Sequence, residues 1–168
     1  QQHCLEVMLK ASSRLEQLIH DLIDFAASER GRLHLSKQLI EVNNLCASAL
    51  QKEQHNVLEK GITIQKDCQP GLPLVEGDQE KLLWVVVQLL DNAMKFTHKG
   101  GKVLIQANPE TGMVHISVID TGIGIPADLE WRNTQSLGLK LVISLVNQLD
   151  GTIDLDRTRG TALTMVLK

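Results

Sequence analysis

The chain has 168 residues with a formal net charge of -3, and 43% of its residues are hydrophobic. This length allows one domain with a sizeable core plus an attached element. The small negative charge excludes broad electrostatic attraction to nucleic acid or to an anionic membrane, and no apolar run approaches the roughly 20 residues of a membrane-spanning helix.

Residues 4–30 are predicted to form one long helix, because their apolar residues recur at spacings of three and four. Gly31 follows where a helix C-terminus would lie. The spacing alone leaves open a core helix of a globular domain. The apolar stripe consists of Leu5, Met8, Leu9, Leu15, Leu18, Ile19, Leu22, Ile23, Phe25 and Ala26.

From residue 37 onward, predicted helices and strands are mixed. The helix at 80–96 follows Asp78 as its N-cap and is apolar on several sides, so we expect it to be buried. This order predicts the α+β class, as a two-layer α/β sandwich with a mixed sheet and helices on one face. In chain order the predicted elements are a short strand or connector at 37–41, a helix at 42–60 ending at Gly61, a strand at 62–66, a turn at 70–73, an extended piece at 74–78, the helix at 80–96, strands at 102–107 and 113–119 around a hairpin loop at 108–112, a helix at 137–149, and strands at 152–156 and 161–167.

Three cysteines, Cys4, Cys46 and Cys68, are scattered singly, without the paired spacing of a metal site. Their odd number favours reduced thiols and a cytoplasmic location. The chain begins with Gln rather than Met, which predicts a fragment whose upstream portion is missing.

Two polar motifs stand in a suitable order for a nucleotide site. Asn92 and Lys95 are three residues apart on one helix face, where they can offer an amide oxygen to a hard cation and a charge to phosphate. Asp120 follows a predicted strand, and its carboxylate can accept a hydrogen bond from the exocyclic amine of a purine. Gly122 and Gly124 come directly after it and let the backbone approach a ligand closely.

These motifs form part of a wider pattern. They are Leu89-Leu90-Asp91-Asn92-Ala93-Met94-Lys95-Phe96-Thr97, Asp120-Thr121-Gly122-Ile123-Gly124, Ser136-Leu137-Gly138-Leu139 and Gly160-Thr161. In this order they resemble the N, G1, G2 and G3 boxes of the ATP-binding domain of sensor histidine kinases, within the superfamily shared with gyrase, Hsp90 and MutL. The resemblance covers about residues 62–168. Residues 15–33 also look like the second helix of the histidine kinase dimerisation hairpin.

The resemblance implies phosphate and metal contacts for four positions. Asn92 would coordinate Mg²⁺, and Lys95 would contact phosphate. Gly138 and Leu139 begin a predicted helix, and their N–H groups would face the phosphates, because a helix N-terminus attracts anions.

The resemblance implies that the other four positions hold or surround the base. Asp120 would fix adenine through its N6 amine, and Gly122 and Gly124 would shape the pocket. Thr161 would lie behind Asp120 and support its hydrogen bonds. ATP and Mg²⁺ are therefore the expected cofactors, with Asn92 as the metal ligand.

Three features depart from the family pattern. Gln88 stands where gyrase and Hsp90 carry a water-activating glutamate, so ATP hydrolysis of that kind is disfavoured. The lid between Pro126 and Gly138 is short, and Ser136 replaces the first glycine of the usual Gly-Leu-Gly-Leu. This form resembles a subset of histidine kinases with naturally reduced lids, and deletion of a flexible loop would give the same sequence. The six histidines lack the acceptor motif of a His followed by an acidic residue and Arg-Thr-Pro, and we expect them, like Trp84 and Trp131, to have structural roles. Trp131 in the lid could also cover the nucleotide.

The resemblance predicts residues 1–36 as the incomplete second helix of the dimerisation hairpin, and residues 37–168 as the ATP-binding catalytic domain. The chain would be the kinase core of a two-component sensor, an enzyme without a catalytic residue of its own and with its acceptor histidine outside this chain. A response regulator receiver domain and a second copy, bound through the N-terminal helix, would be its partners. A cytoplasmic location, including the cytosolic part of a membrane sensor, is expected. The alternatives are a degenerate, non-catalytic dimerisation and regulator-docking module and, ranked last, a serine kinase of the anti-sigma type.

Overall fold

The computed structural model describes residues 19, 23, 35–125, 130–133, 136–158 and 160–168. The predicted helix at 4–30 lies outside this part, except for Ile19 and Ile23, which are both helical and exposed. The elements are β1 (Gln38–Ile40), α2 (Val42–Lys60), β2 (Thr63–Cys68), β3 (Val75–Gly77), α3 (Gln79–Phe96), β4 (Lys102–Glu110), β5 (Met113–Asp120), the 3-10 turn η1 (Trp131–Asn133), α4 (Leu137–Gln148), β6 (Thr152–Asp156) and β7 (Thr161–Leu167).

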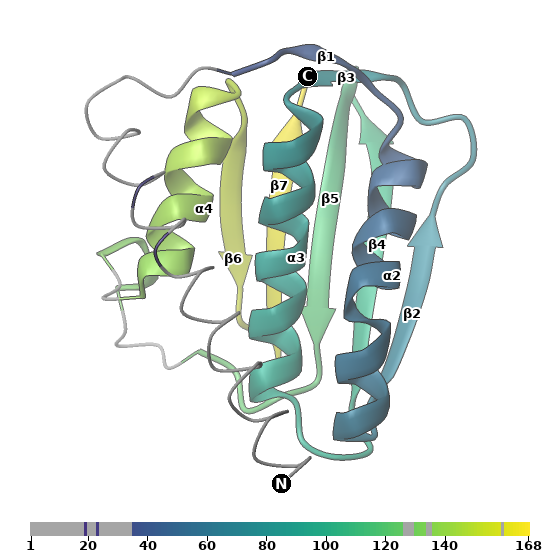
Figure 1. The fold of residues 1–168 in the computed structure, drawn as a ribbon, viewed down its shortest axis with the longest axis vertical. Coiled ribbons are helices and arrows are strands. Elements are labelled where there is room, and N and C mark those ends of the chain that lie inside the picture. Colours follow the sequence, from purple (N-terminus) through teal and green to yellow (C-terminus); the bar gives the residue numbers. More distant parts are fainter. Residues whose placement is uncertain (1–18, 20–22, 24–34, 126–129, 134–135, 159) are drawn as a thin grey trace, which may run out of the picture.

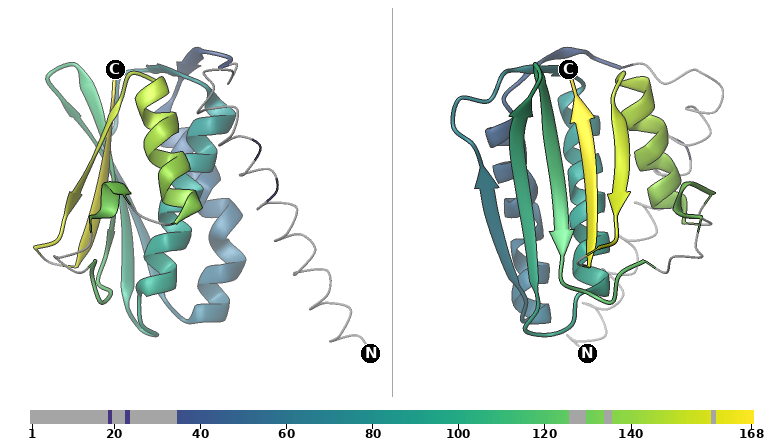
Figure 2. Two further views of the ribbon diagram at one scale, coloured as in Figure 1. Left: turned by 90° about the vertical axis from the view of Figure 1, so that its left-hand side faces the viewer. Right: turned by 180° about the vertical axis from the view of Figure 1, so that it is seen from behind.

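The main sheet has five strands in the order β2-β4-β5-β7-β6. β2 pairs parallel with β4, and the other neighbours pair antiparallel, so the sheet is mixed. The helices α2, α3 and α4 cover one face of this sheet, and the other face is bare of described helices (Figures 1 and 2). The predicted two-layer sandwich is confirmed.

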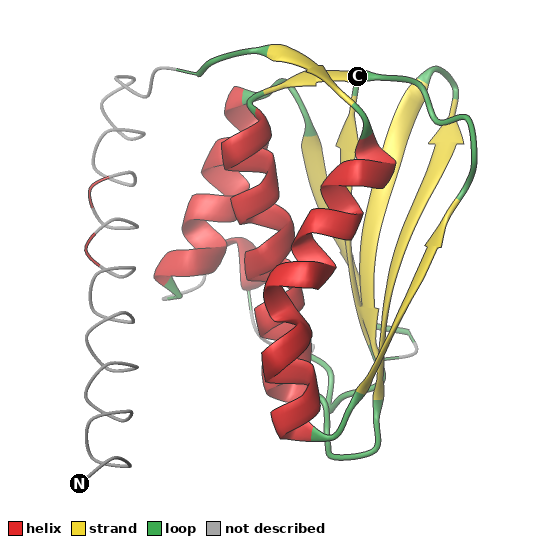
Figure 3. Ribbon diagram, turned by 45° about the vertical axis from the view of Figure 1, so that its right-hand side comes forward, coloured by secondary structure: helices red, strands yellow, loops and turns green. Residues whose placement is uncertain are grey.

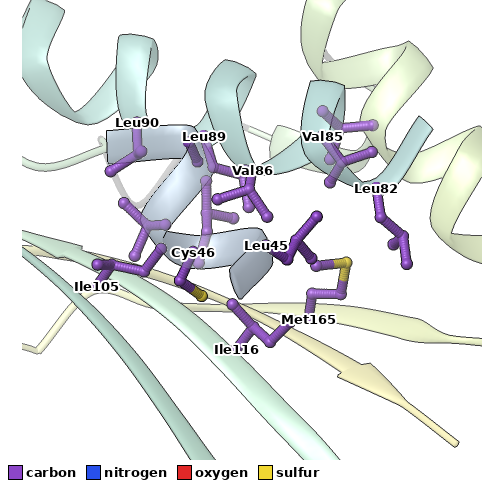
Figure 4. Close-up of a cluster of buried hydrophobic side chains, with 14 of the residues drawn as sticks. Leu45, Cys46, Leu82, Val85, Val86, Leu89, Leu90, Ile105, Ile116 and Met165 are labelled. Carbon is purple, nitrogen blue, oxygen red and sulfur yellow. The ribbon is translucent and has the colours of Figure 1, made fainter. Parts of the chain in front are cut away.

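The core lies between the helix layer and the sheet. α3 is the central helix, and its side chains Leu82, Val86 and Leu89 are almost fully buried. They meet the sheet side chains Ile116 and Met165 in one cluster (Figure 4). α3 packs against the sheet on one side and lies between α2 and α4 in the helix layer. It is therefore a rigid support for side chains at its ends.

A second sheet of two strands, β1 and β3, crosses one end of the sandwich (Figure 3). Asp78 follows β3 and is the N-cap of α3, as predicted: its Oδ1 accepts a hydrogen bond from the Lys81 N–H at 3.1 Å. Its Oδ2 accepts another from the Ser36 N–H at 2.9 Å. One carboxylate therefore ties the connector before β1 to the start of α3.

The predicted bounds of α2 are confirmed, and Gly61 ends the helix as predicted, in the left-handed conformation with φ 62°.

The predicted five-residue hairpin loop at 108–112 is wrong. β4 continues to Glu110, and only Thr111 and Gly112 form the turn, both with positive φ. Pro109 fits in the strand because β4 has lost its β2 neighbour beyond Ala107, so no sheet partner requires an N–H there.

Within the described residues, no helix has both the length and the apolar character needed to cross a membrane.

Candidate functional site

A cavity of about 280 Å³ opens at the C-terminal end of α3. Its walls come from α3, the ends of β5 and β7, the loop after β5 and the start of α4. The volume is close to the lower limit of ordinary small-molecule sites. The lining residues are Leu89, Asn92, Ala93, Lys95, Phe96, Val118, Asp120, Ile123, Gly124, Ile125, Ser136, Leu139, Thr161 and Leu163.

The floor of the cavity is a pair of adjacent strand ends. Asp120 is the register partner of Thr161, and Val118 is the partner of Leu163. Residues two apart in a strand share a face, so all four side chains point to the helix side of the sheet. This arrangement places one carboxyl group among apolar side chains.

Asp120 is 3% exposed, and burial raises the pKa of its carboxyl group. Two hydrogen bonds act in the opposite direction: the Gly122 N–H donates to its Oδ1 at 2.7 Å, and the Thr161 hydroxyl bonds to it as well. The carboxylate can accept further hydrogen bonds from a ligand, because each of its oxygens has more than one acceptor position.

Two glycines allow the backbone to pack tightly around Asp120. A side chain at Gly160, which has φ 101°, would collide with the backbone oxygen of Asp120. A side chain at Gly122 would collide with the backbone oxygen of Phe96, at the end of α3. The loop after β5 is thus pressed against both α3 and the start of β7.

The polar residues of α3 lie at the rim of the cavity. Asn92 is half-buried and Lys95 is exposed, and both contribute to the lining. The Lys95 ammonium lies 5.5 Å from the centre of the Phe96 ring. A cation and an amide therefore border the cavity on the side opposite the sheet.

The start of α4 forms another part of the rim. Ser136 is its N-cap and Leu139 is buried against the cavity. The N–H groups in the first turn of a helix have no acceptors within the helix, so this end favours negative charge. A Cβ at Gly138 would lie 3.0 Å from the Gln88 side-chain oxygen, which shows how closely α4 approaches α3 here.

The described part of the predicted lid is fastened to the edge of the sheet. The Arg132 guanidinium donates to the Ile153 carbonyl at 2.8 Å and to the Asp154 carboxylate at 2.7 Å. Its charged group lies 4.5 Å from the centre of the Trp131 ring, and Trp131 packs against the core. The contact with the core confirms the expected packing role of Trp131, which is not among the residues that line the cavity.

Of the eight predicted site residues, Asn92, Lys95, Asp120, Gly124, Leu139 and Thr161 line the same cavity. Gly122 and Gly138 support it from outside the lining, through the contacts described above. The predictions missed the apolar walls, which include Val118, Ile123, Ile125 and Leu163. The alternation of β5 and β7 could have identified Val118 and Leu163, because each lies two residues from a predicted polar residue.

The described histidines show no catalytic arrangement at the cavity, which none of them lines. His55 Nε2 lies 3.3 Å from a Glu59 oxygen, and His115 Nε2 lies 3.5 Å from a Glu110 oxygen. Within the described residues, no group of three or more His, Cys, Asp or Glu side chains could hold a metal ion.

Residues 77–168 match the family described as Histidine kinase-, DNA gyrase B-, and HSP90-like ATPase. The chain is 29% identical to sensor protein DivL of Caulobacter vibrioides over 92% of its own length. The match covers 21% of DivL, so the chain spans about a fifth of that relative.

Two solved structures have a similar fold. The histidine kinase AdeS of Acinetobacter baumannii superposes with a TM-score of 0.83 at 21% identity, covering 97% of this chain and 82% of that one. The full-length ShkA structure in complex with AMPPNP superposes with a TM-score of 0.81 at 26% identity, covering 94% of this chain and 36% of that one.

Proposed function

Because the chain belongs to the family of histidine kinase-, DNA gyrase B- and HSP90-like ATPases, we propose that residues 37–168 bind ATP with Mg²⁺. The observation that carries this proposal is Asp120, a buried carboxyl group on the floor of an apolar cavity. A carboxylate there accepts a hydrogen bond from the adenine N6 amine while the flat base packs between the apolar walls. Guanine carries an oxygen at the corresponding position, so the same site disfavours GTP.

The rim supplies groups suited to phosphate. Lys95 brings a positive charge, and the first turn of α4, which contains Gly138 and Leu139, offers N–H groups. Asn92 has a hard oxygen donor of the type that Mg²⁺ takes in combination with substrate phosphates and water. When bound, Mg²⁺ would offset phosphate charge, and Asn92 is the residue that would hold it.

In the intact protein, this domain would be the kinase core of a two-component sensor. It would drive phosphorylation of a histidine and transfer of the phosphoryl group to a response regulator receiver domain. The relative DivL is a sensor protein, and the ShkA structure contains AMPPNP, an ATP analogue. The chain would act in the cytoplasm, as a dimer held by the helix predicted in residues 1–36.

The alternative is a degenerate module that dimerises and docks a regulator without kinase activity. The observation that favours it concerns the described part of the lid: Arg132 holds η1 against β6, and residues 130–133 are not among those that line the cavity. A His-acid-x-Arg-Thr-Pro stretch upstream in the full-length protein would favour the kinase, and its absence there would favour the module.

Calorimetric titration tests the binding site directly. ATP with Mg²⁺ should bind with 1:1 stoichiometry, and GTP with Mg²⁺ should bind at least about tenfold more weakly, because it cannot donate from the position of N6. Replacing Mg²⁺ with EDTA should weaken ATP binding. Equal affinities for ATP and GTP would contradict the Asp120 assignment, and no binding of either would favour the docking module.

Sedimentation tests the assembly. The chain should form dimers, and deletion of residues 1–30 should give a monomer that still binds ATP. If the 168-residue chain is monomeric at high concentration, or if the truncated chain is unfolded, the dimerisation role of the helix is contradicted. The chain alone should not become labelled from radioactive ATP, because it lacks the acceptor motif.

A further inference from the structure

Hydrogen bonds hold the first turn of α2 against the end of β2, in a part of the fold that does not line the cavity. The Lys66 ammonium donates to the backbone and side-chain oxygens of Asn43 at 3.3 and 3.4 Å. The Asn43 amide in turn donates to the Gln69 carbonyl at 3.0 Å. These contacts hold α2 against the last residues of β2.

Two cysteines lie at this contact between α2 and β2. Cys46 is one helical turn after Asn43 and is fully buried, and Cys68 lies between Lys66 and Gln69 and is half-buried. Lys66 and Cys68 are two residues apart in β2, so their side chains share the strand face from which Lys66 reaches α2. Cys46 belongs to the buried core cluster and Cys68 packs against that cluster, so the two thiols lie on facing sides of the contact between α2 and β2. Figure 4 shows Cys46 among the buried side chains between α2 and the sheet.

The two thiols differ in environment. Burial raises the pKa of the Cys46 thiol, the neighbouring Cys68 raises it further, and the charge of Lys66 acts in the opposite direction. Cys46 is therefore protected from reagents in solution. Cys68 has part of its side chain exposed, so a small oxidant can reach it first.

We propose that Cys46 and Cys68 are a redox-active pair that hydrogen peroxide converts to a disulfide between α2 and β2. The Cys68 sulfur attacks one peroxide oxygen, the O–O bond breaks, and Cys68 becomes a sulfenic acid as the first water leaves. The Cys46 sulfur then attacks the Cys68 sulfur and loses its proton, and the S–O bond breaks to release the second water. In total, two thiols are oxidised by two electrons, and one peroxide is reduced to two waters.

The placement of the two thiols on facing elements favours the second step despite the raised pKa of Cys46, because the attack is intramolecular. The reaction is also compatible with a reducing cytoplasm, where disulfides are typically transient and redox-sensing. A thiol reductant would restore the pair.

The disulfide should stabilise the domain without closing the nucleotide cavity. Cys68 is opposite Ala107 of β4, whereas Asp120 is opposite Val103 of the same strand. These positions are roughly 13 Å apart along the strand. Oxidation should therefore raise the midpoint of thermal unfolding by about 5 °C and leave the ATP affinity within about twofold of its reduced value.

The test uses the full chain with Cys4→Ser, which leaves only the two thiols of the pair. After treatment with peroxide, intact mass spectrometry should show the loss of two hydrogens, and a non-reducing digest should contain a peptide linked through Cys46 and Cys68. Dithiothreitol should reverse both changes. The proposal is overturned if the chain remains reduced, or if Cys68 is oxidised to sulfinic acid without a linked peptide.

Two variants separate the roles of the thiols. Cys46→Ala, which keeps the site apolar, should accumulate a Cys68 sulfenic acid that dimedone traps. Cys68→Ser should leave Cys46 unmodified under the same treatment. Rapid dimedone labelling of Cys46 in Cys68→Ser would contradict the assignment of Cys68 as the first thiol to react. The linked peptide in the parent chain tests the proposal even if a variant fails to fold.

Discussion

Two buried aspartates lie at opposite ends of the sandwich and have different surroundings. Asp78 is 7% exposed, and each of its carboxylate oxygens accepts a backbone N–H. Asp120 is 3% exposed and lies on the floor of the cavity. Burial of a carboxylate therefore does not by itself identify a ligand site. The space that the carboxylate faces distinguishes the structural aspartate from the one available to a ligand.

The glycines beside the two aspartates differ in the same way. A Cβ at Gly77 would lie 2.7 Å from Leu82 Cδ1, the end of a flexible side chain. A Cβ at Gly160 would collide with the backbone of Asp120, and φ at Gly160 is already 101°. A side chain at Gly77 can therefore be accommodated by movement of the Leu82 side chain, whereas a side chain at Gly160 requires movement of the backbone.

The largest expected effect is therefore that of Gly160→Ala. It should lower the free energy of unfolding by about 2–4 kcal/mol, because it adds both backbone strain and a collision with Asp120. Gly77→Ala is the matched control and should cost about 1 kcal/mol. Urea denaturation of both variants measures the difference. Equal losses would mean that the two ends of the sandwich are equally rigid.

Asp120→Asn should weaken ATP binding by about 1.5–3 kcal/mol, or about 10- to 150-fold, through loss of a charge-assisted hydrogen bond. Asp78→Asn should leave the ATP affinity of the folded chain within about twofold of the parent value, because Asp78 is at the other end of α3. Calorimetry on both variants tests the contrast. An unchanged affinity in folded Asp120→Asn would remove the adenine assignment.

Asp78→Ala should lower the free energy of unfolding by about 1–2 kcal/mol, because α3 loses its N-cap and the Ser36 N–H loses its acceptor. The variant should retain its affinity for ATP once folded. Thermal unfolding with and without ATP measures both quantities. A specific loss of ATP affinity would show that the connector and the cavity are coupled through α3.

Local patterns in the sequence predicted most of the fold. The bounds of α2 and the N-cap at Asp78 follow from spacing and capping residues close in the chain. The hairpin loop was predicted too long because Pro109 indicates a loop unless the missing sheet neighbour is known. The length of β2 determines whether Pro109 fits, and that length is a long-range property.

The polar residues of the site were predicted, and its apolar walls were missed. Asp120 and Gly122 are neighbours in the sequence, whereas Thr161 and Leu163 reach the cavity only through pairing of β5 with β7. Thr161 was predicted through the family resemblance, and Leu163 was not predicted. The contact of Ser36 with Asp78 spans 42 residues and has no local signal. Outside the site, the burial of Glu53 could have been predicted from the sequence, because Glu53 continues the buried stripe of Val42, Cys46 and Ala49 on α2.

The smallest expected effect concerns pH and depends on the raised pKa of Asp120. Between the ordinary pKa of an aspartate and this raised value, the folded chain binds more protons at Asp120 than the unfolded chain does. The contribution of Asp120 to stability is therefore present at low pH and is lost as pH rises through the raised pKa. ATP affinity should change in the opposite direction: it should fall by at most about tenfold per unit as pH drops through the same range, because protonation removes the acceptor.

The matched control for both measurements is Asp120→Asn, which cannot titrate at this position. Its ATP affinity should keep only the pH dependence of the nucleotide itself, and its unfolding curve should lose the part contributed by Asp120. Calorimetry and thermal unfolding across the acidic range give the two differences. If the parent chain and Asp120→Asn share the same pH profile for ATP, the carboxylate is not in contact with the base, and Asp120 would then be a structural aspartate like Asp78.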